Sequence, residues 1–412
     1  MKTTFAGRVA SLNFLTRNPA PRRAGGAAWL CAIAAIATVA AFSFVSPSRA
    51  EGPDVYNIGG IFSMSGAAPY YGTVMSRGAQ IAIDDINAAG GIDGTKLNLV
   101  IEDHKSGDAQ AAVAGINRLI TVSNAQAVMS SFSGPTVAIA PISQEKGIFV
   151  LNGGGVSPRL IGLSSNMFHT RALATDLAAV GVQRAHERGF KRVAQIATKS
   201  EFGDSMIKAA TEAAEKLGME VVVAEQFVTD ATNIDTQVAK LRASRPDVVL
   251  SWPTTPQSGM VVKRVRELGM TQPIIVTEWT AEDTKIAGVA NAEGTEVVID
   301  YFKPGDDNPA GKKFYDKYIE LYHTPPDYIA ANYYEAIDVI AELIKRAKAK
   351  GGDYWNGARL TEALWENPTF DSIYGGTMVF QKNGIAQKPV AILNIKNGEP
   401  ILDKYVTAGG SE

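Results

Sequence analysis

The sequence predicts an α/β protein of two doubly wound, Rossmann-like lobes with mainly parallel sheets, and three observations predict it. Strand-like and helix-like segments alternate from Asp54 onward, as expected where crossover helices link parallel strands. The same alternation starts again at Lys191, which predicts a second sheet of similar construction. No Ser/Gly-rich linker separates the two sets, so we expect lobes joined by several chain crossings, with a hinge and a ligand cleft between them.

The first lobe is expected to begin with a buried strand over 55–62 and a helix over 69–89. Ala79, Ile83 and Ile86 recur at helical spacing there, and the glycines that follow end the helix. Further strands are expected over 97–101, 127–129, 147–151 and 168–171, with helices over 108–122 and up to residue 146.

The second lobe is expected to repeat this order. Gly218 and Gly269 follow two of the predicted helices, at the position where a residue in the left-handed conformation commonly ends a helix. Beyond a strand over 297–299 the pattern changes to long helices, and a turn over 382–384 is expected to join the last two strands. The first lobe is expected to comprise residues 51–173 and 302–385, and the second lobe residues 174–301 and 386–412. The further strands are expected over 193–197, 220–224, 248–251, 274–277, 377–380 and 390–395. The further helices are expected over 176–188, 204–217, 233–243, 257–268, 309–322, 328–350 and 359–366.

The first fifty residues have the composition of a secretory signal peptide. They hold six basic and no acidic residues, an apolar run over 27–45, and the ending Ser48-Arg49-Ala50. We expect cleavage after Ala50 and a periplasmic mature protein. The apolar run is long, so an uncleaved membrane anchor is an alternative.

Charge and cysteine content exclude several classes of function. Without the leader's six basic residues, 34 of the 40 Lys and Arg stand against 42 acidic residues, a formal charge of −8, which argues against nucleic acid as a partner. The only cysteine, Cys31, lies in the leader, so the mature chain has neither a disulfide framework nor a cysteine metal site.

Two strand-to-helix turns lie close together between Ala127 and Leu160. Ser133 precedes Pro135 at capping distance, and Ser157 precedes Pro158 in the same way. The first turn of a helix exposes unpaired N–H groups, so two adjacent helix starts favour capture of a carboxylate or another small anion. The alternative is a pair of ordinary turns with nothing bound.

No set of residues predicts catalysis. The four histidines are scattered, and no nucleophile elbow, phosphate-binding loop or dinucleotide fingerprint occurs. We therefore expect no enzyme, no cofactor and no metal. Six aromatic residues do follow predicted strand ends, which is where ligands bind in such sheets: Tyr70, Tyr71, Phe132, Phe202, Trp252 and Trp279.

Against this background the chain resembles the periplasmic branched-chain amino-acid (Leu/Ile/Val) binding proteins, the type I solute receptors of ABC importers. The resemblance covers nearly the whole mature chain. It rests on Ser63-Met64-Ser65-Gly66 through Tyr71-Gly72, on the run from Ala82 to Ile92 with Gly94, on Phe202-Gly203 and on Glu278.

The resemblance implies a monomeric receptor that binds a small amino acid and delivers it to a membrane permease. It implies that lobe-one backbone N–H groups and hydroxyls hold the carboxylate, and that Glu278 holds the ammonium group. A buried acid without a cation partner is costly, which also favours an amine or amide donor opposite Glu278. The expected ligand-binding residues are Tyr71, Ser133, Gly134, Gly154, Val156, Ser157, Phe202, Thr254 and Glu278.

Three positions differ from the family's pattern. Val156 replaces a threonine, while Thr254 and Phe202 replace tyrosines. These differences, together with Trp252 and Trp279, leave open a receptor for an aromatic or aliphatic carboxylate, urea or a short amide. A membrane-tethered sensory domain is the remaining alternative.

Overall fold

The computed structural model describes residues 52–386 and 388–406. The predicted signal peptide over 1–50, with Cys31, lies outside these residues. Within the described part of the chain, no helix combines the length and the apolar character that crossing a membrane requires.

The first lobe contains a five-stranded parallel sheet, as the sequence predicts. All neighbouring strands pair in parallel, so the carboxyl ends of all five meet at one edge of the sheet. The strands are β1 (Val55–Phe62), β2 (Lys96–Asp103), β3 (Ala127–Ser130), β4 (Phe149–Asn152) and β5 (Met167–His169), in the order β2-β1-β3-β4-β5.

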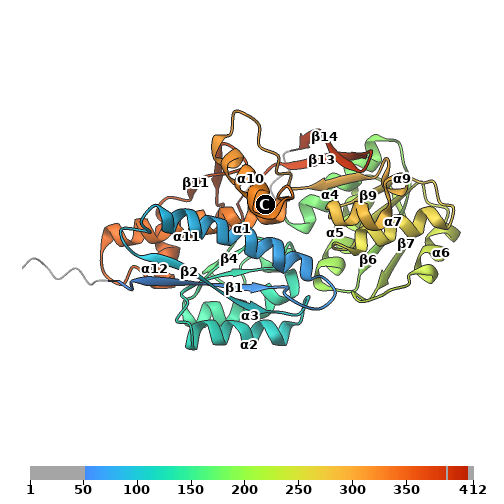
Figure 1. Ribbon diagram of the computed structural model, residues 1–412. Helices are drawn as coiled ribbons and strands as arrows, with labels where there is room; N and C mark the ends of the chain where they lie inside the picture. The colour runs from blue at the N-terminus through green and yellow to red at the C-terminus, as the bar shows by residue number, and fades with distance from the viewer. Residues whose placement is uncertain (1–51, 387, 407–412) are drawn as a thin grey trace, which may run out of the picture. The chain divides into compact units, whose positions relative to one another are not determined.

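Helices cover both faces of this sheet (Figure 1). Alternation along the strands explains this, because successive side chains point to opposite faces. In β3, Met129 belongs to the core under α1 (Pro69–Ala88) and α11 (Tyr328–Lys350). Its neighbour Val128 belongs to the core under α2 (Ala109–Thr121) and α3 (Ser133–Lys146).

Helices α1 and α11 pack closely on each other at Gly78. A Cβ atom at Gly78 would lie 2.0 Å from the carbonyl oxygen of Ala330, so only glycine permits this approach. Helix α1 carries Tyr71 and α11 carries Tyr328, and both of these side chains donate to Glu278. The contact at Gly78 therefore fixes the two helices that position them.

The second lobe contains a seven-stranded mixed sheet. Five neighbouring strands are parallel, and an antiparallel hairpin completes the sheet at one edge. The strands are β6 (Arg192–Thr198), β7 (Glu220–Phe227), β8 (Val248–Trp252), β9 (Ile274–Val276), β10 (Glu296–Ile299), β13 (Val390–Lys396) and β14 (Glu399–Val406), in the order β14-β13-β10-β9-β8-β6-β7.

The remaining helices connect these strands or extend the first lobe. They are η1 (Pro158–Leu160), α4 (Ala174–Glu187), α5 (Glu201–Lys216), α6 (Asp235–Ala243), α7 (Gln257–Glu267), α8 (Ala281–Ala287), α9 (Val289–Ala292), α10 (Pro309–Tyr322) and α12 (Gly357–Glu366). The two-lobed α/β fold with mainly parallel sheets is thus confirmed, and the residue boundaries of the lobes stay a proposal.

The prediction for the last strands is partly wrong. The turn over 382–384 does not join the last two strands, because β12 (Thr377–Val379) pairs with β11 (Thr369–Asp371), which the sequence analysis did not predict. Strand β13 pairs instead with β10 and with the unpredicted β14. The side chains of β14 are mostly exposed, so the strand lacks the apolar pattern that reveals a buried strand.

Candidate functional site

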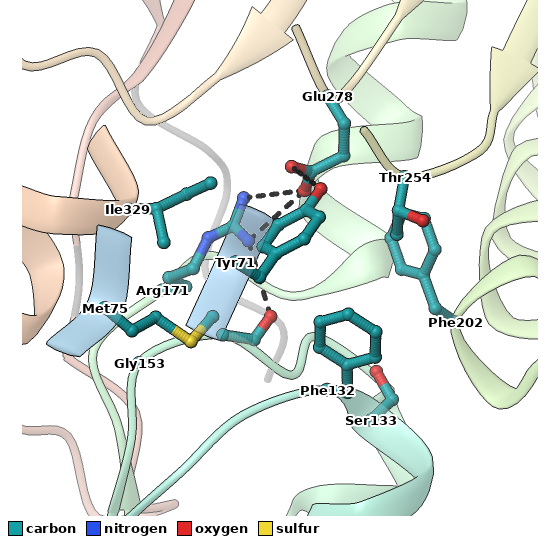
Figure 2. A pocket seen from close by; sticks show the side chains of 11 residues that line it. Tyr71, Met75, Phe132, Ser133, Gly153, Arg171, Phe202, Thr254, Glu278 and Ile329 are labelled. Atoms are coloured by element: carbon teal, nitrogen blue, oxygen red, sulfur yellow. Dashed lines mark hydrogen bonds and ion pairs between the residues drawn. The ribbon is translucent and has the colours of Figure 1, made fainter. Parts of the chain in front are cut away.

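A small cavity lies between the two lobes, at the carboxyl ends of strands from both sheets. Its volume is about 30 Å³. Six of the expected site residues line it: Tyr71, Ser133, Gly154, Phe202, Thr254 and Glu278. The other lining residues are Met75, Phe132, Gly153, Arg171 and Ile329. Ser133 and Glu278 lie on opposite sides of this cavity (Figure 2).

Ser133 acts differently from the helix cap that the sequence predicts. The residue before helix α3 is Phe132, which makes no capping hydrogen bond, and Ser133 is already the first helical residue. The Ser133 Oγ atom accepts hydrogen bonds from the N–H groups of Val156, at 3.1 Å, and Ser157, at 3.2 Å. Two donors on Oγ leave the hydroxyl proton of Ser133 to be donated, and no described residue accepts it.

The start of α3 also supplies backbone donors. The first N–H groups of a helix have no partner within it, and Phe132 gives no side-chain cap. The N–H groups of Ser133 and Gly134 have no acceptor among the described residues, and the positive end of the helix dipole lies there. Gly134 itself does not line the cavity. The hydroxyl of Ser133 and this helix start can therefore hold an anion.

The turn after β4 supplies fewer donors than expected. Asn152 Oδ1 accepts from the N–H groups of Gly154, at 3.2 Å, and Gly155, at 2.7 Å. The N–H groups of Val156 and Ser157 already donate to Ser133. The expectation of unpaired N–H groups in this turn is therefore wrong, because side chains of the protein accept those hydrogens.

Val156 and Ser157 do not line the cavity. Val156 is buried in the apolar core of the second lobe's sheet. Ser157 caps η1 by accepting from the Arg159 N–H, and its hydroxyl donates to Glu201 Oε1, 2.7 Å away on α5. Ser157 therefore joins the two lobes beside the cavity.

Glu278 is a buried acid with several donors around it. It follows β9, and 3% of its surface is exposed. The hydroxyl groups of Tyr71, at 3.2 Å, and Tyr328 donate to Oε2. Arg171 Nη1 and Nη2 donate to Oε1 at 3.3 Å each. Burial raises the pKa of Glu278, and Arg171 and the two hydroxyls offset only part of that rise.

Arg171 is the principal residue that the sequence analysis missed. It stands two residues after β5, and its Nε donates to Asp300 Oδ2 at 2.7 Å. Burial by itself would lower the pKa of Arg171, but Asp300 and Glu278 raise it well above the ordinary value. Asp300 directly follows β10, so the rule that ligands bind at strand ends could have found both residues. The expectation that Glu278 lacks a cation partner is wrong.

Aromatic residues form the walls of the cavity. The rings of Tyr71 and Phe132 meet edge to face, with centroids 5.2 Å apart. Phe132 has a φ of +60°, which is strained for a residue with a side chain and occurs mainly where surroundings impose it. The strained backbone directs this ring toward the cavity.

The remaining strand-end aromatics lie elsewhere. Trp252 is buried in the second lobe, where its Nε1 donates to Gln195 Oε1 at 2.8 Å. Tyr70 and Trp279 line a separate cavity near Asp300. Neither tryptophan enlarges the cavity between Ser133 and Glu278.

Comparisons with known proteins agree with this architecture. The sequence profile of the family described as periplasmic binding protein matches residues 55–400. An amino acid binding protein of Pseudomonas aeruginosa is 30% identical over 272 residues, covering 61% of this chain and 72% of that protein. A Leu/Ile/Val-binding protein of Escherichia coli is 25% identical over 285 residues, covering 69% of this chain and 76% of that protein.

Solved structures share the fold at lower identity. A branched-chain amino acid transporter substrate binding protein from Streptococcus pneumoniae, in complex with isoleucine, gives a TM-score of 0.77 at 23% identity and covers 85% of this chain and 99% of its own. An ABC transporter solute binding protein from R. palustris, in complex with benzoate, gives a TM-score of 0.78 at 17% identity and covers 87% of this chain and 98% of its own. Since the family profile spans most of the chain, the protein belongs to the periplasmic binding protein family.

Proposed function

We propose that this protein is the periplasmic solute-binding component of an ABC importer. It closes its two lobes around a small carboxylate-bearing molecule and delivers that molecule to a membrane permease. The observation that carries the proposal is the cavity at the strand ends of both lobes, with an anion-holding helix start on one side and a buried acid on the other.

The size of the cavity supports a hinge motion. Pockets that hold small ligands usually enclose about 300–1,000 Å³, whereas this cavity measures about 30 Å³. A ligand can therefore enter only when the lobes move apart. Hydrogen bonds that cross between the lobes, such as the bond from Ser157 to Glu201, would break and form again in each cycle.

Two ligand classes are candidates. A small amino acid, branched-chain or otherwise aliphatic, is favoured by the sequence relatives and by the position of Glu278 opposite Ser133. An aromatic or aliphatic carboxylate is favoured by Arg171, which already supplies a cation to Glu278. Urea and short amides are the uncharged alternatives, and they carry no negative charge for the helix start at Ser133 to hold.

Calorimetric titration tests the proposal. The protein is unfolded and refolded to remove any retained ligand, and then titrated with amino acids, carboxylic acids, urea and amides. We expect at least one carboxylate to bind, and mass spectrometry of the molecule retained by protein from the native host should identify the same class. Tight binding of an uncharged compound only, with no binding of any carboxylate, would refute the proposal.

The alternative of a membrane-tethered sensory domain has a separate test. If the protein is a released periplasmic receptor, N-terminal sequencing of the secreted form gives Glu51 as its first residue. An intact leader on protein in the membrane fraction would favour the sensory alternative.

A further inference from the structure

The hydrogen-bonding capacity of Glu278 is already used within the protein. An ionised carboxylate has about four lone-pair sites for donors. Glu278 accepts four hydrogen bonds. Two nitrogens of Arg171 donate to Oε1, and the hydroxyl groups of Tyr71 and Tyr328 donate to Oε2. A ligand ammonium group could bind Glu278 only by displacing one of these donors.

The guanidinium of Arg171 bridges the two lobes across the cavity. Its Nη1 atom donates to Glu278 Oε1, in the second lobe, at 3.3 Å (Figure 2). The same atom also donates to the carbonyl oxygen of Gly154, in the first lobe, at 3.3 Å. A carbonyl oxygen and a carboxylate facing each other are the acceptors that an ammonium group would otherwise use. Arg171 thus stands where the cation of an amino acid would be expected.

Arg171 is also held firmly in this position. Its Nε atom pairs with Asp300 at 2.7 Å, and its guanidinium lies over the ring of Tyr328, 5.2 Å from the centroid. Both members of the Arg171–Asp300 pair are at least 95% buried. Separating a buried, hydrogen-bonded ion pair is strongly unfavourable, so a ligand amine does not readily displace Arg171.

We propose that Arg171 is a built-in counter-ion for Glu278 that takes the place of a ligand ammonium group, so that the site prefers small carboxylates without an α-amino group. This inference rests on the proposed function. Because Glu278 and Asp300 carry two negative charges against the single charge of Arg171, the ligand's carboxylate lies away from them, at Ser133 and the start of α3. The apolar part of the ligand contacts Met75, Phe132 and Ile329.

The direct test uses ligand pairs that differ only in the α-amino group. The refolded protein is titrated with leucine and 4-methylpentanoate, valine and 3-methylbutanoate, and phenylalanine and 3-phenylpropanoate. We expect the amine-free member of at least one pair to bind tenfold or more tightly than its amino acid. Tighter binding of the amino acids would overturn this inference and leave the proposed function intact, whereas no binding by any member would count against both.

A variant tests the role of Arg171 itself. Arg171→Met with Asp300→Asn removes one positive and one negative charge, so it leaves the net charge unchanged and Glu278 without a cation. The affinity ratio of leucine to 4-methylpentanoate should then rise at least tenfold. A purely structural role would weaken both ligands equally, and an unchanged ratio in the folded variant would refute the inference.

Two further variants complete the test. Arg159→Gln removes a cation that pairs with Glu201 at the surface and does not line the cavity, so the ratio should stay within twofold. If the double variant does not fold, Arg171→Lys is measured instead. It keeps the charge but cannot donate to Gly154, Glu278 and Asp300 in the same planar arrangement, so the ratio should shift toward leucine; no shift would again refute the inference.

Discussion

The hydroxyl of Tyr71, on the first lobe, donates to Oε2 of Glu278, on the second lobe, across 3.2 Å. The same hydroxyl accepts from the N–H group of Thr255 at 2.9 Å. All three residues are buried. One side chain of the first lobe therefore satisfies two polar groups of the second, and this couples the closure of the lobes to the geometry of the site.

Replacing Tyr71 by phenylalanine should weaken ligand binding. The variant leaves the buried Thr255 N–H without a partner when the lobes close, at a cost of roughly 1–3 kcal/mol. We expect a comparable loss of binding free energy in calorimetric titration with the carboxylate that the parent protein binds most tightly.

Tyr70→Phe is the matched control, since Tyr70 bonds Asp327 at 2.6 Å and does not line the cavity between Ser133 and Glu278. Its affinity for the ligand should stay within twofold of the parent's. Equal losses in the two variants would contradict a specific role of Tyr71 in closure.

Two substitutions of Phe132 should separate its ring from its strained backbone. Phe132→Ala and Phe132→Gly both remove the edge-to-face contact with Tyr71, so both should lower ligand affinity. Only glycine adopts the positive φ without strain, so the glycine variant should be more stable than the alanine variant by about 1 kcal/mol. Urea unfolding of both variants measures the difference, and equal stabilities would show that the backbone strain at this position is small.

Gly78→Ala should destabilise the first lobe by about 2–3 kcal/mol, because the new Cβ would lie 2.0 Å from Ala330 O and would force α1 and α11 apart. Gly134→Ala is a matched control within a helix. The nearest atom to its Cβ would be 3.8 Å away, which is an ordinary contact. Its stability should equal or exceed that of the parent in urea unfolding, and a similar loss in both variants would contradict the steric explanation.

The buried His104 should make stability depend on pH. Burial lowers the pKa of His104 to about 4, although Asp103 and Asp108 oppose this shift. The unfolded chain binds the proton first, near the ordinary pKa of about 6.5. The contribution of His104 is therefore complete above pH 6.5 and is lost as the pH falls toward 4. The linkage relation gives a loss of about 2 kcal/mol between pH 7 and pH 5.

The comparison of parent and His104→Gln isolates this contribution, since burial raises the pKa of carboxyls such as Asp283, to about 6, and so acts in the opposite direction. In urea unfolding at both pH values, the parent should lose about 2 kcal/mol more than the variant between pH 7 and pH 5. Equal losses in parent and variant would contradict this prediction, because they would mean that His104 binds its proton equally well in the folded and the unfolded state.

Much of the fold follows from local patterns in the sequence. Strand β1 has the predicted bounds, and α1 begins at the predicted Pro69, because apolar periodicity and helix signals reside in neighbouring residues. Strand β14 was missed for the converse reason: its exposed side chains carry no apolar pattern, and it forms by pairing with β13.

The candidate site divides in the same way. The alternation of elements was sufficient to predict a two-lobed protein, and the residues that follow the strands pointed to Ser133 and Tyr71, since parallel strands bring their carboxyl ends to a common edge. Glu278 was selected through the family resemblance. The partners of these side chains came from tertiary structure alone. Arg171 and Glu278 are 107 positions apart, and Ser133 and Val156 are 23 apart. The first pair depends on how the two sheets are placed against each other, and the second on how the turns after β3 and β4 pack within one sheet. Both arrangements are set by packing over the whole core, which no short stretch of sequence encodes.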